Sequence, residues 1–417
     1  MSFFIQSLFI VIPIFIILIV LEIIVAKKMK IKINNPVDII SSLSSGITNI
    51  AKDGLKFGVL IISYSWLVKH ITILKIEPIW LAIIIAFIVQ DFSGYWLHRM
   101  NHRINIFWNR HIIHHSSEEF NLSCALRQEI STIVRFGAIF MLPAALLGIS
   151  PTIFAVLGPI HLFMQFWYHT RLINKMGLLE KIFVTPSHHR VHHAINTKYM
   201  DKNYGQILII WDKFFGTFQP ELKEEKPVYG IIRPANTWNP IIINYKHFWQ
   251  LLKDAYYTKT WKDKLRIWFM PTGWRPKDVE DLFPIKSTRD SKSQIKYQTN
   301  NSRKLILWSF FQLFISGSLM LLMFSIASKI SNITLFCLAF FLILNVFSYT
   351  SMLDGRKKIS IITDLIKLAF ILYIILTQDF NSDIFLEPYI IIFATYAVIS
   401  TLATIYFTKS EPQLNIS

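Results

Sequence analysis

Residues 3–25 read FFIQSLFIVIPIFIILIVLEIIV, an apolar run whose most polar side chains, Gln6 and Glu22, lie near its two ends. A helix that crosses a bilayer needs about 20 predominantly apolar residues, and this run is long enough. It is too long for the apolar core of a typical signal peptide, and no small-x-small cleavage site follows it. The stretch therefore predicts a membrane anchor.

The composition of the whole chain agrees with a membrane protein. Of its 417 residues, 53% are hydrophobic and 17% are charged, whereas soluble domains carry about 25% charged residues. This much apolar surface excludes a disordered chain. Cys124 and Cys337 are the only cysteines and lie far apart in the sequence, which excludes a disulfide-stabilised scaffold.

Eight further apolar runs follow the first one, and together they predict an all-α, multi-pass helical bundle with nine spans. The first of the eight is the weakest, and the third and fourth are expected to form a hairpin around Ser150 and Pro151. The runs cover residues 55–68, 78–97, 132–148, 152–168, 305–327, 333–349, 359–376 and 389–407.

The basic residues predict how the bundle lies in the membrane. The formal net charge is +17, no Lys or Arg precedes the first run, and Lys27, Lys28, Lys30 and Lys32 follow it. Basic residues concentrate on the cytoplasmic side of spans, so nine spans predict an outside N-terminus, with residues 98–131 and 169–302 in the cytoplasm. Because the cations flank apolar runs, an anionic membrane surface accounts for the charge, and nucleic acid is excluded as a partner.

A polar segment predicts the domain organisation. Residues 287–303 are rich in Ser, Asn, Gln and Lys and have the composition of a linker. We therefore expect a membrane-embedded catalytic domain at 1–286, a linker at 287–303 and a four-helix transmembrane region at 304–417.

Histidines carry the strongest functional signal. Eleven of the thirteen lie between His98 and His193, in the patterns HRMNH (98–102), HIIHH (111–115) and HHRVHH (188–193). Positions i, i+3 and i+4 share one face of a helix, so we expect the imidazoles of each cluster to point in one direction.

A single histidine is more often a simple hydrogen-bonding residue than a ligand. Clustered imidazoles, however, would repel one another when protonated and would lack partners when buried. Eight ligands exceed the capacity of one ion, so the clusters predict a dinuclear metal site. The ligands predicted from spacing are His98, His102, His111, His114, His115, His189, His192 and His193.

Imidazole ligands suit Zn, Cu, Fe and Ni. The sequence has no HExxH motif and no cysteine cluster, which argues against a zinc protease and an iron–sulfur protein. Nitrogen ligands at the ends of apolar helices suit iron that activates dioxygen over a lipid chain, although spacing alone leaves zinc open.

These motifs resemble the signature of the fatty acid hydroxylase and sterol desaturase superfamily. Within it, the residues between the motifs are most similar to the alkylglycerol monooxygenase family. The similar stretches are SSE at 116–118, NLSCALRQ at 121–128, QFWYHT at 165–170, TPSHHRVHH at 185–193, DKNYG at 201–205, WDKFFGTF at 211–218 and VYG at 228–230.

The resemblance implies a membrane enzyme with two non-haem Fe ions that hydroxylates the ether-linked carbon of alkylglycerols and releases a fatty aldehyde and a glycerol derivative. It adds His169 to the metal ligands, and it implies tetrahydrobiopterin as the electron donor. The family has an acidic residue directly after HRxxH, where this chain has Arg103. This departure leaves the role of that acid unfilled and weakens the inference of pterin dependence.

Three further polar residues are candidate catalytic residues. Asp91 lies two helical turns before His98, and an ionisable group within a span usually has a function. It could accept the second N–H of a ligand histidine and fix its tautomer, or it could pair with Arg99. Asn196 and Asp201 follow the last cluster, where either could orient a ligand in the same way.

The implied partners are a membrane lipid substrate, O2 and an electron donor, either a reduced pterin or a redox protein. One alternative is a sterol or fatty acid hydroxylase or desaturase with a separate protein donor. A metal transporter or haem-binding electron carrier is disfavoured, because transporters usually bind their cargo near the middle of the membrane. The expected location is a bacterial inner membrane or the endoplasmic reticulum, with the active site on the cytoplasmic side.

Overall fold

The computed structural model describes residues 3–55, 59–132, 134–285, 291–377 and 387–412. In these residues the chain is mostly helical, with very little strand, which confirms the predicted all-α fold class. The only strands there are β1 (Val59–Leu60) and β2 (Val134–Arg135), which pair in parallel over two residues. Part of the predicted linker and part of the apolar run at 55–68 lie outside the described residues.

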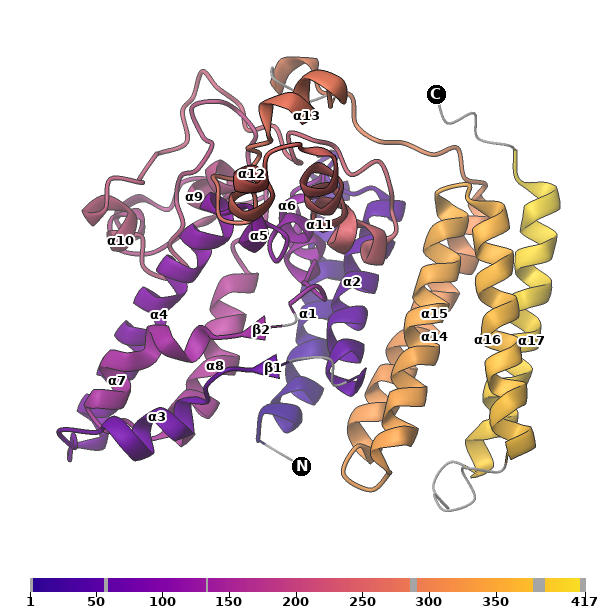
Figure 1. Cartoon of the computed structure of the whole chain (residues 1–417), viewed down its shortest axis with the longest axis horizontal. Helices are drawn as coiled ribbons and strands as arrows, with labels where there is room; N and C mark the ends of the chain where they lie inside the picture. The colour runs from indigo at the N-terminus through magenta and orange to yellow at the C-terminus, as the bar shows by residue number, and fades with distance from the viewer. Residues whose placement is uncertain (1–2, 56–58, 133, 286–290, 378–386, 413–417) are drawn as a thin grey trace. The chain divides into compact units, whose positions relative to one another are not determined.

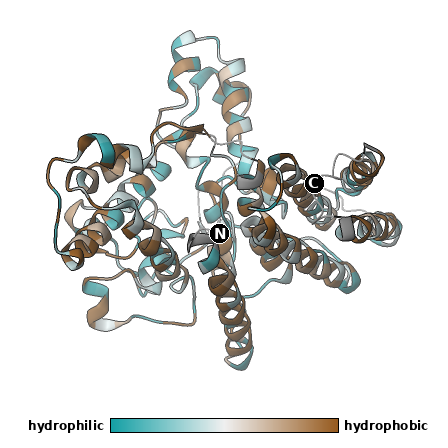
Figure 2. Cartoon of the chain, turned by 90° about the horizontal axis from the view of Figure 1, so that it is seen from below, coloured by the Kyte–Doolittle hydropathy of each residue, from teal (hydrophilic) through white to brown (hydrophobic). Residues whose placement is uncertain are grey.

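Six helices are long and apolar enough to cross a membrane, and Figure 2 shows that the long helices are coloured predominantly as hydrophobic. The protein is therefore a multi-pass membrane protein. The six helices are α1 (Phe3–Lys28), α4 (Ile79–Arg103), α14 (Arg303–Ile326), α15 (Asn332–Leu353), α16 (Lys357–Thr377) and α17 (Glu387–Ser410).

The prediction of nine spans is wrong within the described residues, because three apolar runs do not form one long helix each. In the described part of the run at 55–68, Leu55 ends α2 (Pro36–Leu55), and the later residues form β1 and the start of α3 (Tyr64–Ile71). The described part of the run at 132–148 is divided between β2, η2 (Gly137–Met141) and α7 (Leu142–Leu146). The fourth run forms α8, which has 16 residues, starts at the expected Ser150–Pro151 corner and is capped by the Ser150 side chain. Gly148 lies between α7 and α8 and has a φ of +62°, a conformation that favours glycine.

The chain divides into two compact units. Unit 1 comprises Met1–Asn34, Gly58–Ala235 and Asn244–Ile295. Within it α1 and α4 both contact α8, α3 contacts α7, and the rings of Phe15 and Phe166 stack at 3.9 Å between α1 and α8. Besides α1, α4, β1 and β2, its elements are α3 (Tyr64–Ile71), α5 (Asn105–Trp108), α6 (Ile112–His115), η1 (Leu122–Leu126), η2 (Gly137–Met141), α7 (Leu142–Leu146), α8 (Pro151–Phe166), η3 (Gly177–Lys181), α9 (Pro186–His192), α10 (Ile210–Phe214), most of α11 (Pro240–Tyr257), α12 (Trp261–Arg266), α13 (Lys277–Leu282) and η4 (Ser291–Ser293).

Unit 2 comprises Asn35–Phe57, Asn236–Ile243 and Lys296–Ser417. In it α2 (Pro36–Leu55) packs against α14 and α15, α15 packs against α16, and α16 packs against α17. Figure 1 shows α14 to α17 as four long helices standing side by side. The predicted boundaries at 286 and 303 remain a prediction of domain organisation, and unit 2 includes α2 beside the C-terminal helices.

Unit 2 holds a charged pair inside its helices. Lys367 and Asp364 are both fully buried, and Lys367 Nζ lies 2.7 Å from Asp364 Oδ1 and 2.8 Å from Asn345 Oδ1. Thr404 Oγ1 donates to Asp364 Oδ2 over 2.6 Å. Each buried charge therefore has an opposite charge and a neutral partner, which offsets the cost of removing it from water.

Candidate metal centre

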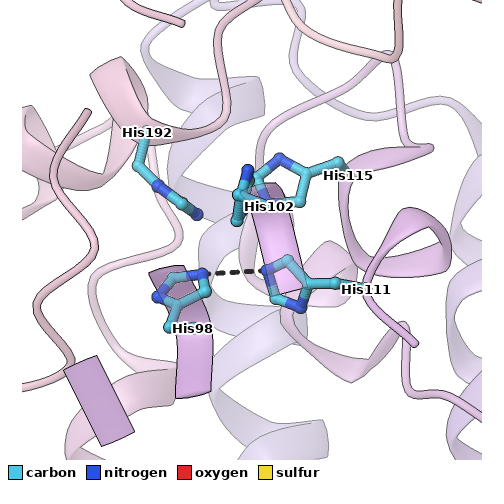
Figure 3. Close-up of side chains that lie close together, drawn as sticks. All are labelled: His98, His102, His111, His115 and His192. Carbon is cyan, nitrogen blue, oxygen red and sulfur yellow. Dashed lines mark hydrogen bonds between the residues drawn. The ribbon is translucent and has the colours of Figure 1, made fainter. Parts of the chain in front are cut away.

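Five histidines form a first group. They come from three parts of unit 1, and Figure 3 shows their rings pointing toward one another. One nitrogen of each lies within 4.8 Å of the corresponding nitrogens of all the others. The first group consists of His98 and His102 of α4, His111 and His115 at the two ends of the α6 turn, and His192 of α9.

Four histidines form a second group under the same limit of 4.8 Å. His189 Nε2 lies 2.8 Å from His169 Nε2 and 3.0 Å from His193 Nε2. His114 Nε2 lies 3.1 Å from His193 Nε2, so the four rings converge on one point from three segments. The second group is His114, His169, His189 and His193.

The two groups adjoin because each HxxHH motif contributes to both. His114 belongs to the second group and His115 to the first, and His192 and His193 divide in the same way. Successive residues on a helix point about 100° apart, so the two members of a His-His pair face different neighbours. The rings of His115 and His193, from different groups, stack with their centres 4.3 Å apart. The structure therefore brings all nine predicted ligands into two adjacent sites.

Local structure explains the convergence. His98 and His102 lie one turn apart in α4, so both face the same side of that helix. α9 begins at Pro186, which suits the first turn of a helix, and its short length presents His189, His192 and His193 to neighbouring segments. His169 follows the end of α8, where the chain turns toward the second group.

Backbone carbonyls fix the orientation of several rings from outside. His98 Nδ1 donates to Tyr204 O at 2.8 Å, and His192 Nδ1 donates to Lys202 O at 2.9 Å. In the second group, His114 Nδ1 donates to Arg127 O at 3.3 Å. When Nδ1 carries the proton, Nε2 keeps its lone pair and is free to bind a metal.

Unsatisfied nitrogen atoms test whether a metal fits these groups. In the part of the chain that the structure describes, Nε2 of His102, His115 and His192 is buried and has no hydrogen-bond partner. An isolated buried nitrogen of this kind costs free energy. Because all three atoms face the first group, a cation bound there would satisfy them. The donor set fits a metal that accepts nitrogen ligands.

The electrostatics of the site favour neutral rings. Burial and the neighbouring imidazoles hold the pKa of His111 and His115 well below the usual value of histidine. The same two causes lower the pKa of His189 and His193. Since only a neutral imidazole binds a metal, the site is prepared for ligation near neutral pH.

Asp91 is buried, but its contacts differ from the expected ones. Its carboxylate accepts hydrogen bonds from Ile207 N at 2.9 Å, Leu208 N at 3.1 Å and Trp211 Nε1 at 2.8 Å. Its nearest histidine nitrogen is Nε2 of His161 at 3.4 Å, and His161 belongs to neither group. The expected hydrogen bond from a grouped histidine to Asp91 is thus replaced by bonds that hold the 207–211 segment.

Asp201 lies beside the first group. Its Oδ1 is 3.9 Å from His102 Nδ1, and its Oδ2 accepts a hydrogen bond from Arg103 over 2.9 Å. Asn196 lies further out, because its Nδ2 donates to Lys226 O at 3.1 Å and its Oδ1 accepts from Val228 N at 2.8 Å. Asp201 therefore lies beside His102, beyond hydrogen-bond distance, whereas Asn196 holds the loop at 226–228.

Two buried acids that sequence reasoning did not single out position the site. Glu22, in α1, accepts hydrogen bonds from Leu122 N at 2.7 Å and from Thr170 Oγ1, next to His169. In the sequence, Glu22 could have been noticed because it is an acid within an apolar run long enough to span a membrane. Asp212 accepts from Tyr204 N at 2.8 Å and Gly205 N at 2.7 Å, and so fixes the carbonyl that receives His98. No local pattern in the sequence distinguished Asp212.

A cavity of about 270 Å³ lies between the end of α8, η3 and the residues just before α9. It is lined almost entirely by apolar side chains, and its one polar lining residue, Thr185, directly precedes the helix that carries His189. Trp167 lines it on the α8 side, directly before Tyr168, whose ring packs 4.3 Å from that of His189. The lining residues are Met164, Trp167, Met176, Leu179, Phe183, Val184, Thr185 and Ile207.

The chain is similar to known membrane oxygenases. Residues 83–217, which include all nine grouped histidines, match the family model of the fatty acid hydroxylases. The chain is 34% identical over 365 residues to alkylglycerol monooxygenase of Homo sapiens, covering 86% of this chain and 80% of that protein. It is 35% identical over 361 residues to the alkylglycerol monooxygenase of Danio rerio, covering 83% and 77%.

An ornithine lipid hydroxylase of Rhizobium tropici is 30% identical over 155 residues, 37% of this chain and 46% of that protein. No solved structure matches the chain significantly. The similarity to the alkylglycerol monooxygenases therefore extends well beyond the histidine motifs, whereas the similarity to the ornithine lipid hydroxylase is confined to a shorter region.

Proposed function

This chain belongs to the fatty acid hydroxylase superfamily and, within it, to the alkylglycerol monooxygenase family, and we propose that it hydroxylates the ether-linked carbon of alkylglycerol lipids. It is an oxygen-dependent oxidoreductase. Hydroxylation beside an ether oxygen gives a hemiacetal, which breaks at the C–O bond to release a fatty aldehyde and a glycerol derivative.

The observation that supports this proposal best is the pair of adjacent, nitrogen-only groups in a member of this family. We assign one non-haem Fe ion to His98, His102, His111, His115 and His192, and a second to His114, His169, His189 and His193. When bound, the iron would supply the activation of O2 and the transfer of one oxygen atom to a C–H bond. Carbonyl acceptors, Asp201 and Glu22 would keep the ligand segments in place.

The apolar cavity suits the alkyl chain of the substrate. Its lining offers no charged group, and its wall at Thr185 begins the helix that carries His189. An alkyl chain held there would place its oxygen-bearing end near the second group and would keep water away from the reacting carbon. Leu179 and Phe183 line the cavity and are also exposed, which is the arrangement expected of a lipid-facing mouth.

Reduced tetrahydrobiopterin is the electron donor that we propose, on the basis of family membership, with a redox protein as the alternative. The exposed pair of Arg103 and Asp201 is a polar surface close to the first group, since Asp201 Oδ1 lies 3.9 Å from His102 Nδ1. A donor bound at this pair would be near the metal ligands without entering the apolar cavity.

We further propose that the site faces the cytoplasm. Lys27 and Lys28 lie in the last turn of α1, Lys30 and Lys32 follow it, and basic residues favour the cytoplasmic side of a membrane. Asn121 Nδ2 donates to Ile33 O over 2.7 Å, so the segment after α6 lies against the lysine-bearing end of α1. Because the site adjoins that end of α1, the orientation of the first span alone is enough to assign the side that we propose. The host membrane would be a bacterial inner membrane or the endoplasmic reticulum.

The test is an assay of the purified protein in lipid with an alkylglycerol, a free fatty acid and a sterol, each with and without reduced tetrahydrobiopterin. Of the three substrates, we expect only the alkylglycerol to yield a fatty aldehyde, and only when the reduced pterin is present. Elemental analysis should find about two iron atoms per chain. A hydroxylated or desaturated fatty acid or sterol, without aldehyde formation, would instead assign the protein to the sibling enzymes that use a protein donor.

A further inference from the structure

Helix α11 turns several polar side chains toward the protein. Asn244 Oδ1 accepts from Ile130 N at 2.9 Å, and His247 Nε2 donates to Asn105 O at 2.9 Å. Asp254 is buried and forms an ion pair with Arg275 at 2.7 Å. These contacts fix which face of α11 is turned away from the protein.

The outward face of α11 is aromatic and aliphatic. Tyr245, Trp249, Leu252 and Tyr256 are all exposed, and their spacing of i, i+4, i+7 and i+11 puts them in one stripe. A helix that faced water would carry polar side chains at these positions. The stripe therefore needs an apolar environment that unit 1 does not provide.

Helix α12 and the turn that follows it carry further exposed apolar side chains. Trp261, Leu265 and Phe269 recur every four residues and are 76%, 70% and 71% exposed. We call the exposed side chains of the two segments together the aromatic stripe. Its seven members are Tyr245, Trp249, Leu252, Tyr256, Trp261, Leu265 and Phe269. Single exposed apolar residues are common, but seven along two consecutive helices mark an interaction surface.

Basic residues surround the aromatic stripe. Residues 245–270 contain six Lys or Arg and two acids. Asp254 is the buried partner of Arg275, and Asp263 pairs with Arg266 at 2.6 Å. The remaining exposed charge around the stripe is thus positive. The six basic residues are Lys246, Lys253, Lys259, Lys262, Lys264 and Arg266.

The C-terminal end of the aromatic stripe lies beside the end of α4, one of the candidate membrane spans. Thr272 N donates to Arg103 O, the last residue of α4, over 3.3 Å. Asn105 N donates to Met270 O and Ile106 N donates to Trp268 O, both over 2.9 Å. Because α4 crosses the bilayer, the segment that carries Phe269 is held beside the headgroup layer.

We propose that the aromatic stripe is seated in the headgroup layer of the same membrane and that its basic rim binds anionic phospholipid headgroups. Trp and Tyr concentrate at this layer because their rings are apolar and carry one polar atom. Lys and Arg bury their alkyl stems there and extend their charges to phosphates. α11 and α12 thus form an interfacial anchor that lies on the bilayer without crossing it.

Spin labelling of the full-length protein tests this proposal. In a Cys337→Ala background, in which Cys124 is buried, labels are attached at Leu265→Cys and Phe269→Cys. The matched control is Lys277→Cys, an exposed polar position in α13 of the same unit. Each protein is placed in nanodiscs of phosphatidylcholine alone or mixed with phosphatidylglycerol. Collisions with O2, which partitions into lipid, and with a water-soluble nickel complex are then compared.

We expect the ratio of O2 to nickel collisions to be several-fold higher at 265 and 269 than at 277, and to rise further with phosphatidylglycerol. Lys259→Glu with Lys262→Glu should remove the response to phosphatidylglycerol and leave the phosphatidylcholine value unchanged. If the labels at 265 and 269 are as accessible to nickel as the control in both lipids, the proposal is wrong. Protection that appears only after an acidic redox protein is added would likewise overturn it in favour of a protein partner.

Discussion

The two histidine groups can be separated by removing one ligand from each within the same helix. His192 and His193 are adjacent, yet His192 belongs to the first group and His193 to the second. His192→Ala leaves four of five nitrogen donors in the first group, and His193→Ala leaves three of four in the second. Since loss of a residue that only orients a ligand costs about 10–100-fold in metal affinity or activity, loss of a ligand should cost turnover more than about 100-fold.

The metal content should respond differently in the two variants. The second group has four donors and the first has five. The iron content of His193→Ala should therefore fall from about two to about one atom per chain, whereas His192→Ala should retain more of its iron. His188→Ala is the matched control, because His188 lies in the same helix and is equally buried but belongs to neither group. Its Nδ1 contacts Thr185 Oγ1 at 3.4 Å.

Elemental analysis and aldehyde formation from an alkylglycerol, on protein that elutes as a single species, measure both effects. We expect His188→Ala to keep both irons and most of its turnover. Parental turnover in His192→Ala or His193→Ala would refute the assignment of ligands. Equal loss of iron in all three variants would show that the effect is general damage to α9.

The remaining predictions concern the surroundings of the site and unit 2. Met164→Trp should fill the cavity and shift the substrate preference toward shorter alkyl chains without changing the iron content. The control Ile160→Trp, on the exposed side of α8, should change neither the chain-length preference nor the iron content. Turnover rates on alkylglycerols of increasing chain length measure the preference. Asp91→Asn weakens the acceptor of Ile207 N, Leu208 N and Trp211 Nε1, so thermal unfolding in detergent should show a loss of about 1–3 kcal/mol, and an unchanged melting temperature would contradict this role. Lys367→Met alone should cost about 3–5 kcal/mol because it leaves Asp364 charged and buried, while Lys367→Met with Asp364→Leu should recover most of that loss; a double variant no more stable than the single one would count against the pair. Burial raises the pKa of Asp354 from 3.8 to about 6, so its protonated form is favoured in the folded state and stability should decrease as pH rises from about 4 to 6; Asp354→Asn should lack this slope in melting curves recorded across that range.

Local spacing was sufficient to find most of the histidines that the structure groups. Eight of the nine grouped histidines follow from intervals of three or four residues, which bring side chains to one helical face. His169 has no such partner, because it reaches the second group only through the turn after α8. The family resemblance supplied it, and spacing alone would have missed it.

Spacing did not predict how the histidines divide between the groups. A cluster that points in one direction requires a continuous helix, but α6 contains four residues and α9 contains seven. In such short helices, neighbours from other segments decide which group receives each ring. Hence His114 and His115 separate, as do His192 and His193.

The predicted number of membrane spans was wrong because some apolar runs contain breaks in the helix. Hydropathy measures the environment of a segment, but a span also requires an uninterrupted helix of sufficient length. α7 and α8 are apolar and too short. α2 was not predicted at all, because Asp38, Lys52 and its serines make it polar in sequence, and only its packing against α14 and α15 explains why those serines are buried.

Arg103 stands where the family motif has an acid, yet the structure supplies a carboxylate at the same place from another part of the chain. Asp201 adopts a φ of +59°, a left-handed conformation in which Asp is enriched among the non-glycine residues, and its carboxylate lies 3.9 Å from His102 Nδ1 and 2.9 Å from Arg103. Here the carboxylate is paired, because Arg103 donates to it over 2.9 Å. Asp201 thus supplies a carboxylate beside the first group, and a donor that approaches this surface meets both a cation and an anion. The substitution at Arg103 is therefore weaker grounds against a reduced pterin than the motif alone indicates.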